Sequence, residues 1–245
     1  MTPRIEVFAP SSWAAATGAR LGRWLAERPG RRLCLPTGST PAPCYAAFAA
    51  YGGRLDATHV FLLDEFLLPA GHPARCDEML RRDLLDRLDH RPLRFDRLDV
   101  DAGSLDEECR RYEMAVADGG LDLTILGIGG NGHLGLNEPG SAMDSPTRIV
   151  ELHPRTVAAA QAYGGAMAAR RGATMGLAAI LASREIWLLA TGSHKAGILQ
   201  RALRGEVGPE VPASFLQRHP HTVVLADEAA AGETGGRRFG RVVPT

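Results

Sequence analysis

The stretch that decides the fold is Leu121-Asp-Leu-Thr-Ile-Leu-Gly-Ile-Gly-Gly-Asn-Gly-His-Leu-Gly-Leu-Asn-Glu-Pro-Gly140. Its first eight residues, 121–128, are almost continuously apolar, as expected for a parallel strand that is covered on both faces. The glycines that follow permit tight turns and a close approach of the backbone to a ligand. Within this frame lie Asn131, His133, Asn137 and Glu138, whose side chains can exchange hydrogen bonds and protons. The stretch therefore predicts a buried strand followed by a functional loop.

Outward from this stretch, short apolar runs alternate with helical patterns. The predicted strands are residues 32–36, 59–63, 93–98, 121–128, 185–190 and 222–225. The predicted helices are residues 40–51, with Thr40 as N-cap, and 76–88, 104–116, 174–183 and 195–203. The alternation predicts an α/β fold, a mostly parallel, doubly wound (Rossmann-like) sheet with helices on both faces. One domain over residues 1–245 is the simplest organisation, with the Gly- and Arg-rich segment 231–245 expected to be mobile.

The composition excludes several classes of protein. The 245 residues are 45% hydrophobic and 23% charged with a formal net charge of zero, which predicts a sizeable core and neither nucleic-acid nor anionic-membrane binding. No apolar run reaches the length of a membrane span, and the N-terminus lacks an apolar signal core, so a cytoplasmic location is expected. The four scattered cysteines form no C-x-x-C pair, so they are interpreted as small core residues, and no metal is predicted.

Two strand-end segments have the chemistry of an anion site. Residues 36–41 place Gly38, Ser39 and Thr40 between a strand and a helix, where free backbone N–H groups attract anions. The alternative is an ordinary capped turn, since no G-K-[ST] follows. Residues 191–195 end on Lys195 at the start of another helix, where it is either a ligand for an anion or a surface lysine.

Asp64 and Glu65 follow a third predicted strand. Two adjacent acids at the end of an apolar strand are awkward to bury, so we expect one to face the site and the other to cap a following turn. A carboxylate in a partly dry cleft can act as a base, and strand-end solvation is the alternative.

The pattern Gly127-Ile-Gly-Gly-Asn-Gly132 also matches a dinucleotide fingerprint. The helix that such a fingerprint requires is not predicted, because residues 137–140 soon break the chain. No acid stands about 20 residues further on at a strand end. We therefore discount a dinucleotide cofactor.

Taken together, the segments resemble the glucosamine-6-phosphate deaminase family. The matching pieces occur in family order at residues 35–41, 63–65, 121–140, 171–176, 191–195 and 211–216. The runs at 131–140 and 211–216 look closer still to the galactosamine-6-phosphate deaminase/isomerase branch. The resemblance implies that an amino sugar 6-phosphate opens its ring, isomerises from aldose to ketose and releases ammonia, with no metal or organic cofactor. It allows a monomer or a homo-oligomer, and it does not separate glucosamine from galactosamine 6-phosphate.

The resemblance also implies roles at the matching positions. Asp64 would move the proton between C2 and C1, and His133 would assist ring opening with Glu138 orienting it. The phosphate would be held by Gly38, Ser39, Thr40 and Lys195.

Two positions depart from the family pattern. Asn131 stands where glucosamine-6-phosphate deaminases have an aspartate, so Glu138 is expected to be the only nearby carboxylate partner of His133. Gln161 falls near the position of a phosphate-binding arginine, for which Arg155, Arg170 or Arg171 would substitute.

Three other functions stay open. A 6-phosphogluconolactonase has the same fold and would hydrolyse an ester. An isomerase or deaminase of another phosphorylated or sulfated sugar fits the changes at Asn131 and Gln161. A sugar-phosphate sensor normally follows a DNA-binding helix-turn-helix, for which the roughly 30 residues before the first predicted strand leave no room.

Overall fold

The computed structural model describes residues 3–164 and 169–232. Its centre is a seven-stranded sheet in the order β1-β10-β9-β6-β2-β3-β5, in which every neighbouring pair is parallel. The strands are β1 (Arg4–Phe8), β2 (Arg31–Leu35), β3 (Thr58–Leu62), β5 (Arg94–Asp96), β6 (Leu123–Gly127), β9 (Glu185–Ala190) and β10 (Thr222–Asp227). The predicted mostly parallel α/β fold is confirmed.

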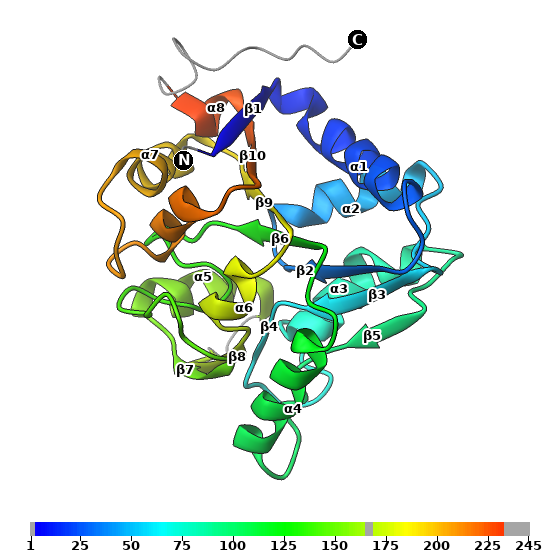
Figure 1. The fold of residues 1–245 in the computed structure, drawn as a ribbon, viewed down its shortest axis with the longest axis vertical. Helices are drawn as coiled ribbons and strands as arrows, with labels where there is room; N and C mark the ends of the chain where they lie inside the picture. The colour runs from blue at the N-terminus through cyan, green and yellow to red at the C-terminus, as the bar shows by residue number, and fades with distance from the viewer. Residues whose placement is uncertain (1–2, 165–168, 233–245) are drawn as a thin grey trace.

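Helices cover both faces of this sheet (Figure 1). One face packs against α1 (Pro10–Ala26), α2 (Pro41–Ala50) and α3 (Cys76–Asp83). The other packs against α4 (Leu105–Ala117), α6 (Leu177–Leu181) and α7 (Ala196–Arg204). Strand β9 shows why its sequence is continuously apolar, since Ile186 and Leu188 enter one core while Trp187 and Leu189 enter the other.

A second, three-stranded sheet was not predicted from the sequence. Its order is β4-β8-β7, and both strand pairs are antiparallel. The strands are β4 (Asp64–Phe66), β7 (Arg148–Glu151) and β8 (Arg171–Thr174), and in Figure 1 they lie below the central sheet beside α5 (Pro154–Gly164) and α6.

Several predicted elements are corrected. The helix predicted over 174–183 is wrong at its start, because Thr174 ends β8 and α6 begins at Leu177. Helix α3 ends at Asp83, and a separate 3-10 turn covers Leu85–Arg87. Thr40 has helical backbone angles and makes no side-chain cap bond, whereas Ser104 caps α4 as predicted by accepting the Glu107 N–H. The first strand is β1 rather than residues 32–36, so the N-terminal residues belong to the sheet.

The direction of winding reverses between β2 and β6. From β2 the chain adds β3 and β5 on one side, and from β6 it adds β9 and β10 on the other. Ligands of open parallel sheets bind at such a switch point, beyond the carboxyl ends of the strands. The loops after β2, β3, β6 and β9 therefore meet where a ligand site is expected.

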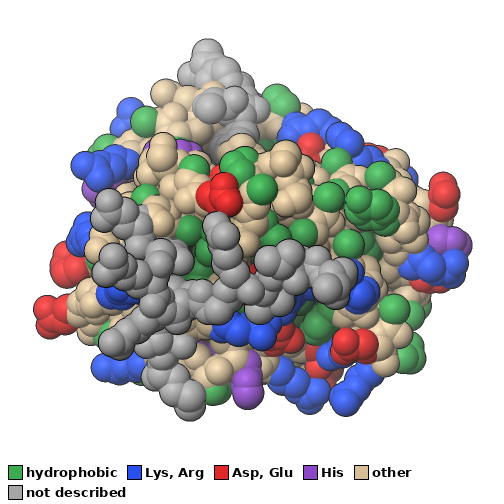
Figure 2. Space-filling view, turned by 90° about the horizontal axis from the view of Figure 1, so that it is seen from above, with side chains coloured by type: hydrophobic (Ala, Val, Ile, Leu, Met, Phe, Trp, Pro, Cys, Tyr) green, Lys and Arg blue, Asp and Glu red, His purple; other side chains and the backbone are tan. Residues whose placement is uncertain are grey.

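The charges on the surface and the lengths of the helices relate to the predicted absence of nucleic-acid and membrane binding. Figure 2, seen from the end that carries β1 and α8 (Glu228–Ala231), shows Lys and Arg side chains in small groups with acidic side chains nearby. Within residues 3–164 and 169–232, no helix is long and apolar enough to cross a membrane. Most of the segment 231–245, expected to be mobile, lies outside the described residues.

Candidate active site

A cleft of about 460 Å³ opens at the switch point. Its walls come from the loops after β2, β3, β6 and β9, together with one face of α5. Of the residues predicted from the sequence, seven line it: Gly38, Ser39, Thr40, Asp64, Asn131, His133 and Lys195. The eighth, Glu138, lies behind His133 and contacts its ring. The structure thus brings all eight predicted residues to one place.

The loop after β2 forms one end of the cleft. Gly38 has φ of +111°, a conformation that side-chain-bearing residues rarely adopt, so glycine is required there. The Tyr45 hydroxyl donates to the Pro36 carbonyl oxygen at 2.7 Å and ties the loop to α2. Helix α2 begins at Pro41 beside this loop, but Pro41 and Pro43 have no N–H and the Ala42 N–H donates to the Gly38 carbonyl oxygen at 3.3 Å, so the donors for an anion come from the loop residues before the helix.

Asp64 and Glu65 divide two roles, as predicted. Asp64 lines the cleft and is only 8% exposed, and burial raises the pKa of its carboxyl to about 6, against the opposing effects of a hydrogen bond from Cys76 and the charge of His133. Glu65 is 0% exposed and accepts the backbone N–H groups of Phe66, Cys76 and Asp77 at 2.8, 2.7 and 2.9 Å. Glu65 therefore caps α3, while Asp64 faces the cleft.

His133 is held by a network of side chains. Its Nδ1 lies 3.4 Å from Glu138 Oε2 and 3.2 Å from Thr156 Oγ1. Asn131 Nδ2 donates to Glu138 Oε2 at 2.7 Å, and Asn131 Oδ1 accepts the backbone N–H of His133 at 3.2 Å. Burial acts to raise the pKa of Glu138, but the hydrogen bond and charge of His133, with Thr156 and Asn131, bring it to about 2. Glu138 is therefore a carboxylate at any working pH.

Glu138 was expected to be the only nearby carboxylate partner of His133, and among the described residues it is the carboxylate that pairs with the imidazole. The charge of His133 also lowers the pKa of Asp64, without a direct pair between the two side chains being formed. The reason is topological, because the loops after β3 and β6 converge over β2, which lies between their strands. Both acids act on one imidazole.

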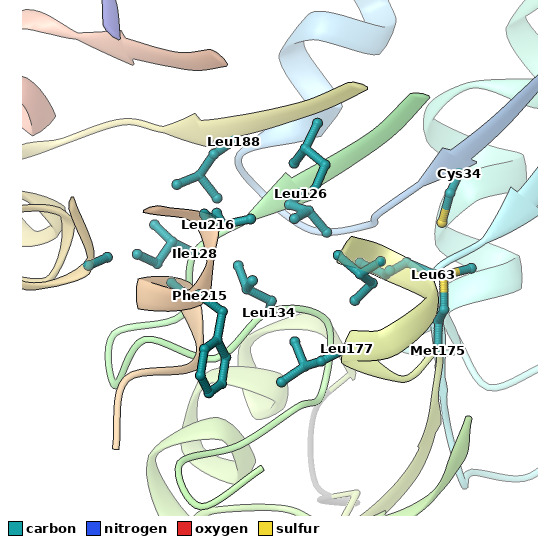
Figure 3. Close-up of a cluster of buried hydrophobic side chains, with 14 of the residues drawn as sticks. Cys34, Leu63, Leu126, Ile128, Leu134, Met175, Leu177, Leu188, Phe215 and Leu216 are labelled. Atoms are coloured by element: carbon teal, nitrogen blue, oxygen red, sulfur yellow. The ribbon is translucent and has the colours of Figure 1, made fainter. Parts of the chain in front are cut away.

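The loop that carries His133 is held in place by core packing and by buried hydrogen bonds. Leu134 points into the core beside Leu126, Ile128 and Phe215 (Figure 3). Asn137, fully buried, donates to the carbonyl oxygens of Leu134 and Met175 at 2.9 and 2.8 Å. Such anchors fix the position of the imidazole before a ligand arrives.

Lys195 lines the cleft from a 3-10 turn, Ser193–Lys195, that precedes α7. Its Nζ donates to the carbonyl oxygen of Ile128 at 2.7 Å, and burial lowers its pKa. The side chain thus reaches back to the end of β6 rather than out into solvent.

Sequence reasoning missed several side chains of the cleft. Thr37 and His194 line it within the segments 36–41 and 191–195 but were not singled out there, and Cys76 and Thr156 line it without standing in any recognised motif. Three arginines were expected to substitute for the phosphate-binding arginine that is missing near Gln161. Of these three, only Arg155 lines the cleft. Arg170 and Arg171 are exposed at the start of β8, where Arg171 pairs with Glu151 at 3.1 Å. In the described residues, no group of three His, Cys, Asp or Glu side chains is placed to hold a metal ion.

This geometry can be compared with known proteins. The family model of glucosamine-6-phosphate isomerases/6-phosphogluconolactonase matches residues 10–225. The chain belongs to this family. It is 39% identical over 232 residues to a glucosamine-6-phosphate deaminase of Rhodopirellula baltica, covering 88% of this chain and 91% of the relative. It is 40% identical over 227 residues to one of Beutenbergia cavernae, covering 89% and 87%. The predicted family is confirmed, and its galactosamine branch stays a prediction.

Solved structures of the family have the same fold. A monomeric glucosamine-6-phosphate deaminase superposes with a TM-score of 0.89 at 30% identity, covering 93% of this chain and 98% of that one. A 6-phosphogluconolactonase from Thermotoga maritima superposes with a TM-score of 0.74 at 19% identity, covering 92% and 99%. The second likeness concerns the fold alone.

Proposed function

We propose that this chain is an isomerising deaminase of a hexosamine 6-phosphate, with glucosamine 6-phosphate as substrate. The observation that carries the proposal is one cleft holding a buried aspartate with a pKa of about 6, a histidine paired with a carboxylate, and an anion loop facing a lysine. The relatives named above are glucosamine-6-phosphate deaminases, which favours that sugar. Galactosamine 6-phosphate, favoured by the 131–140 and 211–216 runs, is the alternative substrate.

The proposed reaction converts the amino sugar phosphate and water into a ketose 6-phosphate and ammonia. His133 takes up the proton of the C1 hydroxyl and delivers one to the ring oxygen as the ring opens, and the anionic Glu138 stabilises the imidazolium formed in between. Asp64 then removes the proton from C2 and returns it to C1, which leaves an imine at C2 that water hydrolyses to the ketone and ammonia. One base must reach both carbons, and a carboxyl with a pKa of about 6 can accept and release a proton near neutral pH.

The phosphate would lie between the loop after β2 and Lys195. Gly38, Ser39 and Thr40 offer backbone and hydroxyl donors at the start of α2. The Lys195 ammonium has three donors, of which the bond to Ile128 uses one. Arg155, an exposed residue that lines the cleft and whose backbone N–H donates to His153 Nδ1, adds a second cation.

Incubation with candidate substrates tests the proposal. Purified protein is supplied with glucosamine 6-phosphate, galactosamine 6-phosphate and 6-phosphogluconolactone, and ammonia, ketose and acid release are measured. Ammonia with ketose from the gluco sugar supports it, and a faster reaction of the galacto sugar changes the substrate. Acid from the lactone with no ammonia from either amino sugar overturns the proposal in favour of the lactonase.

A further inference from the structure

We propose that Cys76 is a positioning residue for this reaction, its thiol holding the Asp64 carboxylate in place and joining it to the anion loop through Thr37. The inference rests on the proposed function, in which Asp64 is the base. Cys76 lines the cleft yet is only 1% exposed, so its sulfur faces the site from within the protein. The sequence had suggested nothing more than a small core residue.

The thiol lies between two side chains of the site. Both side chains act on its pKa through side-chain interactions, Thr37 lowering it and Asp64 raising it, and the thiol in turn lowers the pKa of Asp64. The carboxylate can only accept, so the S–H donates to Asp64, and the Thr37 hydroxyl donates to the sulfur. Thr37 precedes Gly38 in the anion loop, so one side chain links the base to the loop proposed to hold the phosphate.

The backbone around Cys76 fixes the direction of this bond. Cys76 is the first residue of α3, and its N–H is held by Glu65, the residue next to Asp64 in the chain. The preceding Arg75 is 2% exposed and is held by Asp77 at 3.3 Å and Asp101 at 2.7 Å. Asp64 thus contacts the side chain of Cys76, and Glu65 contacts the backbone N–H of the same residue.

A thiol suits this place because it remains a neutral donor. Burial, and then the charge of Asp64, raises the pKa of Cys76 well above its usual value, so the S–H is retained wherever the base works. A weak donor orients the carboxylate without strongly reducing its affinity for a proton, which the base must take up and give back. The other titratable side chains that act on Asp64 or respond to its charge are His133, Cys34, Tyr45 and Tyr112. The last three remain neutral, since burial raises the pKa of each well above its usual value.

The test compares Cys76→Ala, Cys76→Ser and the control Cys109→Ala across the pH range. Cys109 is also buried, at 5% exposed, but lies on α4, which contributes nothing to the cleft among the described residues. Thermal unfolding first establishes that each variant is folded. For Cys76→Ala we expect kcat to fall about 10-fold with KM within about twofold, as for the loss of one hydrogen bond in the reacting geometry. Its acidic limb should move to higher pH, because the lost bond favours the carboxylate. Cys76→Ser should restore most of kcat and bring the limb back, and the control should match the wild type.

An NMR titration of the Asp64 carboxyl separates this inference from the proposed function. A higher Asp64 pKa in Cys76→Ala, reversed in Cys76→Ser, supports the thiol contact whatever the substrate proves to be. Wild-type protein that releases no ammonia overturns the deaminase and with it the catalytic role. Active Cys76→Ala with an unmoved acidic limb, or an equal loss of kcat in both Cys76 variants, overturns the positioning role alone.

Discussion

Asp64 is a residue whose surroundings and role can be tested directly. Its carboxyl is buried at the start of β4, just after β3, and has a pKa of about 6. Asp64→Asn keeps the size of the side chain but removes the base, so kcat for ammonia release should fall about 10²–10⁴-fold with little change in KM. Asp86→Asn, an exposed acid paired with Arg91, is the matched control and should leave both constants unchanged. An Asp64→Asn variant that keeps its activity would show that another residue is the base.

Arg155 is distinguished from Arg171 by its place beside the cleft. Both residues are exposed, but Arg155 lines the cleft, whereas Arg171 lies on β8 and pairs with Glu151. Arg155→Ala should raise KM for the sugar phosphate about 10-fold, as expected when a charged contact to the phosphate is lost. Arg171→Ala should match the wild type in the same steady-state measurement. Equal KM values in the two variants would remove Arg155 from the phosphate site.

Gly129 is required by the histidine beside it. A Cβ at this position would overlap the ring of His133. We therefore expect Gly129→Ala to displace the imidazole and lower kcat by about 10–100-fold, since small misplacements of a catalytic group are costly. Gly103→Ala, in a loop where the added methyl meets nothing within 4 Å, serves as control. Kinetics at saturating substrate, with unfolding temperatures, would show whether the loss is one of geometry or of stability.

At the scale of elements, helix α3 depends on an acid that is distant in sequence. Glu65 accepts three backbone N–H groups, two of them at the start of this helix. Glu65→Ala would leave these donors buried without an acceptor and should lower the free energy of unfolding by about 2–4 kcal/mol in urea titrations. Glu107→Ala, in the first turn of α4 but exposed, should change it by less than about 0.5 kcal/mol.

The elements also show what could be predicted from the sequence. Strands β6 and β9 were found because both faces of each are buried, which leaves a continuous apolar run. Strands β4, β7 and β8 were not, because they are three or four residues long and are defined by pairing with distant segments. Gly172 in β8 packs against Leu136, a contact that no local sequence pattern predicts. Strand order likewise depends on contacts distant in sequence.

The site was predictable to the extent that motifs marked it. Asp64, His133 and Lys195 follow strands and belong to recognisable runs, and they meet in one cleft. Thr156 and Arg155 were harder to find, because they come from the first turn of α5, a helix without a distinctive sequence. Cys76 looked like a core residue and is indeed buried, so only its neighbours reveal its contact with Asp64. The single-domain organisation stays a prediction.

For the whole molecule, the buried base has a cost in stability. The pKa of Asp64 is about 6 in the folded protein against about 4 in an unfolded chain, so the folded state binds this proton more tightly. The contribution of this group to stability therefore improves as pH falls through 6 and is poorest above it. Asp64→Asn should raise the free energy of unfolding by about 2 kcal/mol at pH 8 and by almost nothing at pH 4. Urea titrations at both pH values measure the difference, and an equal or lower stability at pH 8 would contradict it.

The reversal of winding between β2 and β6 has a consequence for synthesis and assembly. The first half of the chain, through α4, carries the anion loop and Asp64, while the second half carries His133, Glu138 and Lys195. The two halves meet where β2 pairs with β6, where β1 pairs with β10 and where β4 pairs with β8. A nascent chain released as far as the turn at Gly119 and Gly120 would lack His133 and the partner strands of β1 and β4. Two fragments divided at that turn would each lack part of the cleft, so neither alone would turn over substrate. Activity would return only when the fragments associate, with β2 paired to β6.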